Sequence, residues 1–197
     1  MNHLAHVLLA GPQPEARLGA MLGDFWRGTP DAEWPAPVQG GVRLHRKIDV
    51  YTDSHPLVAT ARRLFAPPHR RYAGILLDVY FDHVLARHWP RYSDESLEDL
   101  SSDMLSLLSA NARWLPEGLT RFAVYMRRNG LFATYAEHAT IERVLAGIGM
   151  RLRHANPLAS AAPVLWDHAE ELDRSFAEFF PQLRAEATRQ RAQLGLE

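Results

Sequence analysis

The sequence contains no cysteine and one lysine, Lys47, among its 197 residues. Without cysteine the chain forms no disulfide, thiolate zinc site, iron–sulfur cluster or cysteine nucleophile. Any metal must therefore bind through nitrogen and oxygen atoms. No hydrophobic run approaches the ~20 residues that a membrane helix needs. The apolar first ten residues lack the basic start of a signal peptide and lead into Pro12 and Pro14. We therefore expect a cytoplasmic protein that does not enter a membrane.

Signals for β-structure are also scarce. The chain shows no sustained alternation of polar and apolar residues and no Asn-Gly or Asp-Gly turn. It lacks a Gly-x-Ser-x-Gly elbow and a Gly-x-x-x-x-Gly-Lys phosphate loop, which disfavours serine acyl transfer and nucleotide switching. With 47% hydrophobic and 23% charged residues, the composition is that of a globular protein with a sizeable core. The sequence predicts an all-α, single-domain helical bundle over residues 1–197.

Helical periodicity and proline or glycine breaks divide the chain into segments. The loop expected between the first apolar helices covers residues 31–41, which are rich in proline and glycine. We expect Ser54 to cap the helix that follows it and Pro181 to interrupt the C-terminal helix. The predicted helices cover about residues 18–25, 42–52, 55–65, 70–89, 97–112, 118–127, 140–153 and a long C-terminal segment.

The segment 76–83 places two carboxylates, Asp78 and Asp82, one turn apart on a helix that is apolar nearly all round. An unpaired buried carboxylate costs several kcal/mol. These groups should therefore be paired with arginine, protonated or bound to a cation, and a buried salt bridge explains them as well as a metal does. His83 lies about 100° further round the same helix, so it joins the pair only beside a neighbouring helix.

A second polar stripe, formed by His45, Asp49 and Asp53, recurs every four residues and could supply that neighbour. Read alone, it is typical of a solvated helix face. Read together with Asp78 and Asp82, it predicts a site of histidine and carboxylate ligands in a helical core.

Four other residues complete the candidate set for such a site. Asp24 lies beside Gly19 and Gly23, where a second backbone could approach closely, and pairing with a nearby arginine is its alternative. His6 is a weaker candidate, either a core histidine or a proton-transfer residue. Arg46 and Lys47 could stabilise charge on a phosphate. The expected chemistry is metal-assisted phosphoester hydrolysis at Mn²⁺, Mg²⁺, Fe²⁺ or Zn²⁺, and an oxygen-rich site favours Mn²⁺ or Mg²⁺.

Four runs carry a resemblance to a known family. They are Met1–His6 (MNHLAH), Leu22–Gly28 (LGDFWRG), Leu44–Asp53 (LHRKIDVYTD) and Leu77–Trp89 (LDVYFDHVLARHW). In order, these runs closely resemble the bacterial acyl carrier protein phosphodiesterases, a divergent branch of the helical HD phosphohydrolases. No histidine of this chain is followed directly by aspartate, so the doublet that gives the wider superfamily its name is absent.

The resemblance implies an HD-like helical fold and a function. The reaction would be hydrolysis of the phosphodiester between 4′-phosphopantetheine and a serine of holo acyl carrier protein, supported by Mn²⁺. The first-choice ligands that it implies are Asp24, His45, Asp82 and His83. Asp49 and Asp78 would be further ligands or would orient the ligands, and His6 would transfer a proton or orient them.

Arginines suit the proposed partner, because acyl carrier proteins are small, strongly acidic helical proteins. The arginines expected at the docking surface are Arg62, Arg63, Arg70 and Arg71, with Arg127, Arg128, Arg151 and Arg153 as further candidates. Two other functions remain as alternatives. One is hydrolysis of nucleotides or other small phosphodiesters at the same metal. The other is an arginine-rich binding module without catalysis, but a net charge of −1 disfavours nucleic acid as its partner. The sequence does not define an oligomeric state.

Overall fold

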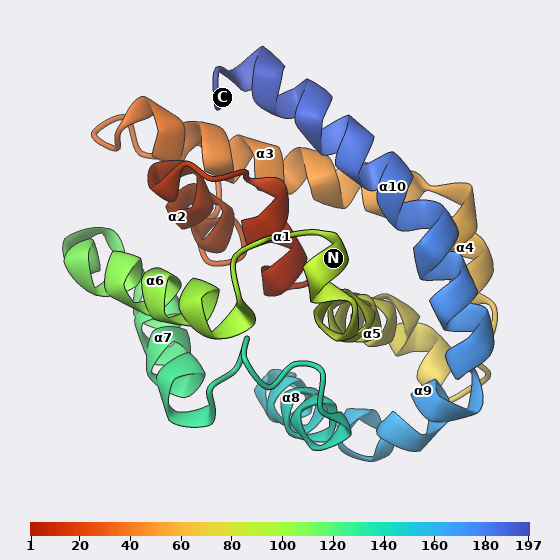
Figure 1. Ribbon diagram of the computed structural model, residues 1–197. Helices are drawn as coiled ribbons and strands as arrows, with labels where there is room; N and C mark the ends of the chain where they lie inside the picture. The colour runs from red at the N-terminus through yellow and green to blue at the C-terminus, as the bar shows by residue number, and fades with distance from the viewer.

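The computed structural model of the protein describes residues 1–197 and consists of helices without strands (Figure 1). This confirms the all-α class predicted from the sequence. The α-helices are α1 (His3–Leu9), α2 (Pro14–Leu22), α3 (Ala36–Ser54), α4 (Pro56–Arg62), α5 (Ala73–Arg87), α6 (Leu97–Ala110), α7 (Glu117–Asn129), α8 (His138–Arg151), α9 (Ala162–Asp167) and α10 (Ala169–Leu194). Short 3₁₀ turns lie at His69–Tyr72, Trp89–Arg91, Ala112–Trp114 and Leu158–Ser160.

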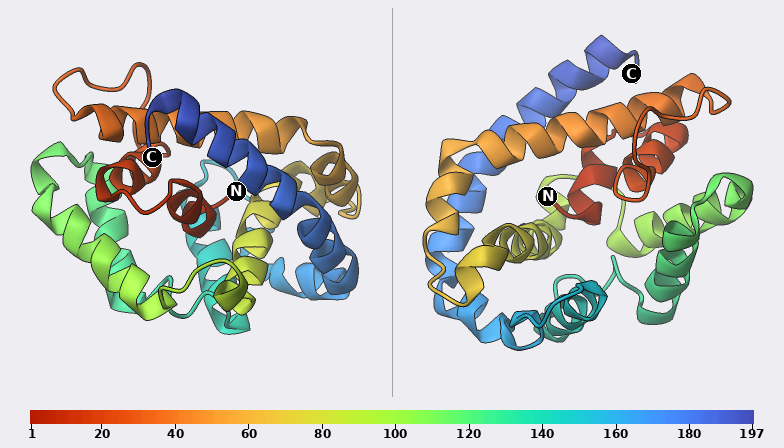
Figure 2. Two further views of the ribbon diagram at one scale, coloured as in Figure 1. Left: turned by 45° about the horizontal axis from the view of Figure 1, so that its top comes forward. Right: turned by 180° about the vertical axis from the view of Figure 1, so that it is seen from behind.

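Helix α1 lies near the middle of the molecule and packs against α2, α5 and α10. The long helix α10 crosses α3, α4 and α5 and closes one side of the fold. In all three views α4 lies on one side of α1 and α7 on the other (Figures 1 and 2). A core cluster of 53 buried hydrophobic residues, from Met1 to Leu196, draws on all of these helices. None of the helices is both long enough and apolar enough to span a membrane.

Helices α2 and α3 pack backbone to backbone through two glycines. A β-carbon on Gly19 would lie 2.1 Å from the carbonyl oxygen of Val38, and one on Gly41 would lie 2.2 Å from that of Ala16. The expectation of a loop up to residue 41 is therefore wrong, because α3 already begins at Ala36. The glycines there do not break the helix but let it pack directly on its neighbour.

Two further expectations about helix ends are wrong. Ser54 is the last residue of α3, and its hydroxyl donates to the carbonyls of Val50 and Tyr51. The cap of α4 is His55, whose Nδ1 accepts from the amide of Leu57. Helix α10 also runs through Pro181 without interruption. Proline removes one backbone donor there, while the buried side chains of Phe179 and Phe180 before it and Leu183 after it keep the helix on the core.

Candidate metal centre

His45 is held in one orientation by the contact between α2 and α3. Its Nδ1 lies 2.8 Å from the carbonyl oxygen of Ala20 and, since a carbonyl only accepts, must carry the proton. Gly23 leaves room for the ring, because a β-carbon there would lie 2.2 Å from Cγ of His45. These contacts aim Nε2 of His45 away from α2 and toward two carboxylates, those of Asp24 and Asp49.

Helix α1 brings a second histidine to the same place. The rings of His6 and His45 stack with centroids 3.7 Å apart. Asp49, one turn after His45, bridges them: its Oδ1 lies 3.1 Å from Nε2 of His6 and its Oδ2 lies 3.2 Å from Nε2 of His45. One potential ligand atom from each of these three residues lies within 4.8 Å of the other two.

Asp24, which follows α2, extends this group toward solvent. Its Oδ1 lies 3.4 Å from Nε2 of His45, and its Oδ2 lies 3.0 Å from Nδ1 of His3. The side chains of Asp24 and Asp49 are each 41% exposed, whereas His6 and His45 are buried. The group is therefore anchored in the core but accessible from outside, as a site for a soluble substrate must be.

The protonation of the group is uneven. Burial by itself lowers the pKa of His45, but the carboxylates of Asp24 and Asp49 outweigh it and raise that pKa to about 9. Burial and the nearby positive charge of His45 lower the pKa of His6 to about 4. Burial opposes ionisation of both carboxylates, yet the histidines hold their pKa values well below the usual range. The two carboxylates carry two negative charges, and the imidazolium of His45 carries one positive charge. The group is therefore negative overall, which favours binding of a cation.

This donor set suits a divalent metal. Imidazole nitrogen and carboxylate oxygen bind Mn²⁺, Fe²⁺ or Zn²⁺, and ligand histidines usually donate their other ring proton to a carbonyl or carboxylate. His45 meets that condition through the carbonyl of Ala20. The group formed by His6, His45 and Asp49 could therefore hold a metal ion, with Asp24 next to it.

Asp82 and Asp78 lie close to this group but have other partners. Asp82 is fully buried and accepts hydrogen bonds from the backbone amides of Leu4, at 2.8 Å, and Ala5, at 3.2 Å. Burial raises the pKa of its carboxyl to about 7, although these donors oppose the rise. Asp78 accepts from the amino group of Met1 at 3.0 Å. The two aspartates predicted as ligands thus secure the start of α1, which carries His6.

His83 lies away from the group. Its Nδ1 donates to the carbonyl of Tyr135 at 3.0 Å, and its ring packs against Trp166 and His138. Burial lowers the pKa of His83 to about 4; two nearby charged groups lower that pKa further, and the Tyr135 carbonyl and one carboxylate oppose the shift. Those groups are Arg87 on the same helix, His138 on α8 and Asp173 on α10. The structure therefore does not bring His83 to the predicted metal site.

Arg46 and Lys47 also point elsewhere. The guanidinium of Arg46 donates to the carbonyls of Gly28, at 2.6 Å, and Trp26, at 2.9 Å, and so fixes the connection between α2 and α3. Lys47 is exposed, and two residues along a helix place it about 200° from His45. Neither side chain lies where it could act on a phosphate at the histidines.

Of the four arginines expected at the docking surface, Arg62 and Arg63 lie at the end of α4, and Arg70 and Arg71 lie in the 3₁₀ turn before α5. Arg62 pairs with Asp53, one turn beyond Asp49 on α3. The other three are exposed: Arg63, Arg70 and Arg71. Arg62 is therefore the one arginine of the four with a contact to the helix that carries Asp49.

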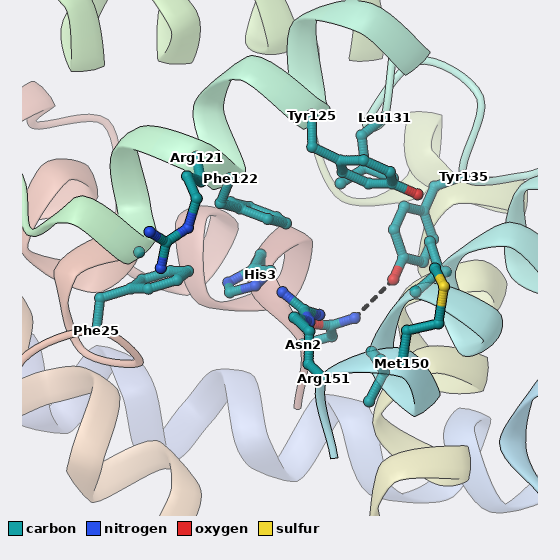
Figure 3. A pocket seen from close by; sticks show the side chains of 14 residues that line it. Asn2, His3, Phe25, Arg121, Phe122, Tyr125, Leu131, Tyr135, Met150 and Arg151 are labelled. Carbon is teal, nitrogen blue, oxygen red and sulfur yellow. Dashed lines mark hydrogen bonds between the residues drawn. The ribbon is translucent and has the colours of Figure 1, made fainter. Parts of the chain in front are cut away.

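Sequence reasoning missed the role of the first residues. Asn2 and His3 line a cavity of about 430 Å³ between α1, α7 and α8, together with Phe25, Tyr125 and Tyr135 (Figure 3). Within the run Met1–His6, the sequence indicates only His6 as a functional residue. Position in that motif was the one signal in the sequence that pointed to His3.

The fold and the histidine–aspartate group define an all-helical protein with a solvent-accessible group of nitrogen and oxygen donors that could hold a metal ion. The family model for acyl carrier protein phosphodiesterase matches residues 1–183. Similar relatives named acyl carrier protein phosphodiesterase occur in Enterobacter sp. (strain 638), at 36% identity over 95% of this chain and 97% of the relative, and in Photorhabdus laumondii, at 34% over 95% of each. The chain belongs to the acyl carrier protein phosphodiesterase family. No solved structure matches it significantly.

Proposed function

We propose that this protein is a divalent-metal phosphodiesterase that removes 4′-phosphopantetheine from holo acyl carrier protein. The bond between the phosphate and the serine oxygen breaks, which gives apo carrier protein and free 4′-phosphopantetheine. The convergence of His6, His45 and Asp49 in a chain of this family supports the proposal. The cytoplasmic location and the absence of a nucleic-acid partner, both expected from the sequence, are part of it.

The proposed ligands are His6, His45, Asp49 and Asp24, and Mn²⁺ is the proposed cation, with Mg²⁺ or Fe²⁺ as alternatives. When bound, the cation supplies Lewis acidity to the phosphoryl oxygens and to the attacking water. Asp78 is not a ligand in this assignment but acts on Asp49 indirectly. It holds the Met1 amino group, which lies 3.9 Å from Asp49. Asp82 and His83 are left out of the ligand set.

The protein groups around the cation orient the ligands and set where protons reside. The Ala20 carbonyl keeps the proton of His45 on Nδ1, so Nε2 can present a lone pair once its own proton leaves. The low pKa of His6 keeps that ring neutral near pH 7, as a ligand must be. His3 contacts the outer oxygen of Asp24 and separates the histidine–aspartate group from the cavity.

The body of the carrier protein is proposed to dock on the side of α4. Acidic carrier surfaces are attracted by Arg62, Arg63, Arg70 and Arg71. Arg62 contacts Asp53, one turn beyond Asp49 on α3. The phosphodiester then reaches the metal between this surface and the cavity beyond His3.

Mass spectrometry of holo carrier protein incubated with the purified protein, with and without Mn²⁺, tests the proposal directly. We expect the carrier protein to lose the mass of 4′-phosphopantetheine only when the metal is present. His45→Ala and Asp49→Asn should abolish this loss and also remove Mn²⁺ binding in calorimetry of chelator-treated protein. His88→Ala is the matched control, because this histidine has no contact with the site, and it should retain both properties.

Substrate preference separates the proposal from its rivals. A panel containing holo carrier protein, nucleotides and simple phosphodiesters should show the highest kcat/KM for the carrier protein. Faster turnover of nucleotides would replace the proposed substrate while keeping the metal site. Carrier-protein binding without any metal-dependent loss of mass would instead identify a binding module.

A further inference from the structure

The cavity beside His3 differs in character from the histidine–aspartate group. It measures about 430 Å³, within the ~300–1,000 Å³ range of sites for small molecules. Aromatic and aliphatic side chains from the end of α2, from α7 and from α8 form its walls, among them Phe25, Phe122 and Ile148. Figure 3 shows His3 near the middle of these residues, with Phe25 and Phe122 on one side and Tyr135 on the other.

Polar groups are present at a few points of this wall. The side-chain Nδ2 of Asn2 donates to the hydroxyl of Tyr135 at 2.6 Å, which leaves the side-chain Oδ1 of Asn2 and the Tyr135 hydroxyl proton without a protein partner. Arg121 and Arg151 add donors from α7 and α8. A ligand that fits must therefore have a mainly apolar surface. It must also carry hydrogen-bond donors and acceptors at intervals along its length.

A helical glycine keeps part of this space open. Gly147 lies inside α8 and lines the cavity, and a β-carbon built on it meets no atom within 4 Å. Glycine inside a helix costs about 1 kcal/mol relative to alanine, and no close helix packing here requires its small size. This contrasts with Gly19 and Gly41, where backbone atoms fill the equivalent space.

We propose that this cavity binds the pantetheine arm of the substrate, an inference that rests on the proposed function. The arm consists of methyl-bearing and methylene segments joined by two amides, which matches apolar walls with isolated donors and acceptors. His3 fixes the direction, because it contacts Asp24 at one side and the cavity at the other. The phosphate end lies at the metal ligands, and the thiol end lies toward Ile148 and Met150.

Binding of free pantetheine to the metal-free protein tests the cavity without relying on catalysis. Calorimetry should detect binding to the wild type and at least a tenfold weaker affinity for Gly147→Leu, whose side chain would occupy the open space. The matched control is Ala139→Leu, an exposed position of the same helix outside the cavity, which should bind pantetheine as the wild type does. Melting temperature and Mn²⁺ affinity of Gly147→Leu should stay near wild-type values, which excludes unfolding as the cause.

A second variant protects the test if Gly147→Leu is poorly folded. Arg151→Ala removes an exposed donor from the cavity wall and should weaken pantetheine binding three- to tenfold. With holo carrier protein as substrate, Gly147→Leu should lower kcat/KM at least tenfold. Wild-type affinity in both variants, or tighter binding of AMP than of pantetheine, would overturn the assignment.

The two proposals fail in different ways. If the wild type removes the prosthetic group but Gly147→Leu does so equally well, the cavity assignment is wrong and the proposed function stands. If the wild type binds pantetheine in a manner that depends on Gly147 but never releases the prosthetic group, the cavity assignment stands and the proposed reaction is wrong.

Discussion

Gly23 offers a sharp test of how the metal ligands are positioned. The residue has φ −52° and ψ −39°, an ordinary helical conformation, so alanine would introduce no backbone strain. A β-carbon there would, however, lie 2.2 Å from Cγ, 2.5 Å from Cδ2 and 2.7 Å from Cβ of His45. The Gly23→Ala substitution must therefore move the imidazole that contacts both Asp24 and Asp49.

The expected cost follows from two contributions. Overpacking of a buried contact costs about 1–3 kcal/mol, and loss of the bond from Nδ1 of His45 to the Ala20 carbonyl adds about 1 kcal/mol. A protein of this length loses roughly 2–4 °C in melting temperature per kcal/mol, so Tm should fall by roughly 5–15 °C. Mn²⁺ affinity should fall about 10- to 100-fold, as when a group that orients a metal ligand is lost.

Thermal unfolding of the metal-free protein and calorimetric titration with Mn²⁺ measure the two effects separately. Gly74→Ala is the matched control. It adds the same methyl group inside α5, where the nearest atom is 3.5 Å away in the flexible side chain of Arg62, and it should raise stability by up to about 1 kcal/mol. Unchanged Tm and unchanged Mn²⁺ affinity in Gly23→Ala would refute both the rigid placement of His45 and its role as a ligand.

Two further predictions concern residues outside the proposed ligand set. The pKa of His83 is about 4 in the folded protein against about 6.5 in the unfolded chain, so the unfolded state binds the proton first and acidification destabilises the fold. Between pH 7 and pH 4.5 the free energy of unfolding of the wild-type protein should fall by roughly 2 kcal/mol through this residue. Urea unfolding of His83→Phe should show a fall smaller by that amount. Equal falls in the two proteins would contradict a buried neutral His83. Reversal of charge at Arg70 and Arg71 should lower kcat/KM for holo carrier protein several-fold at low ionic strength and less at high salt, whereas unchanged kinetics at low salt would remove this surface from docking.

Helix periodicity predicted most of the fold, because one apolar face repeats along each helix. It failed where tertiary contacts override local preference. Gly40 and Gly41 indicated a loop, yet direct packing of α3 on α2 stabilises a helix through them. Pro181 indicated a break, yet the buried face of α10 continues past it. Neither contact is encoded within a window of neighbouring residues.

The candidate site could also be predicted only in part, because local spacing was informative and tertiary contacts were not visible in the sequence. The spacing of His45 and Asp49 identified one face of one helix, and the structure brings Asp24 and His6 to that face. The spacing of Asp78 and Asp82 identified a second face equally well, but spacing does not reveal the partner of a carboxylate. Whether that partner is a cation or a backbone amide depends on how another helix begins beside it.

Helix α1 connects the two parts of the proposed site. It has only seven residues, and isolated helices of this length are not stable in water, so its position depends on the contacts that Asp82 makes with its first amides. From this anchored start the chain sends Asn2 and His3 to the cavity and His6 to the metal ligands. A buried carboxylate held by backbone amides thereby determines how the cavity and the histidine–aspartate group are placed relative to each other.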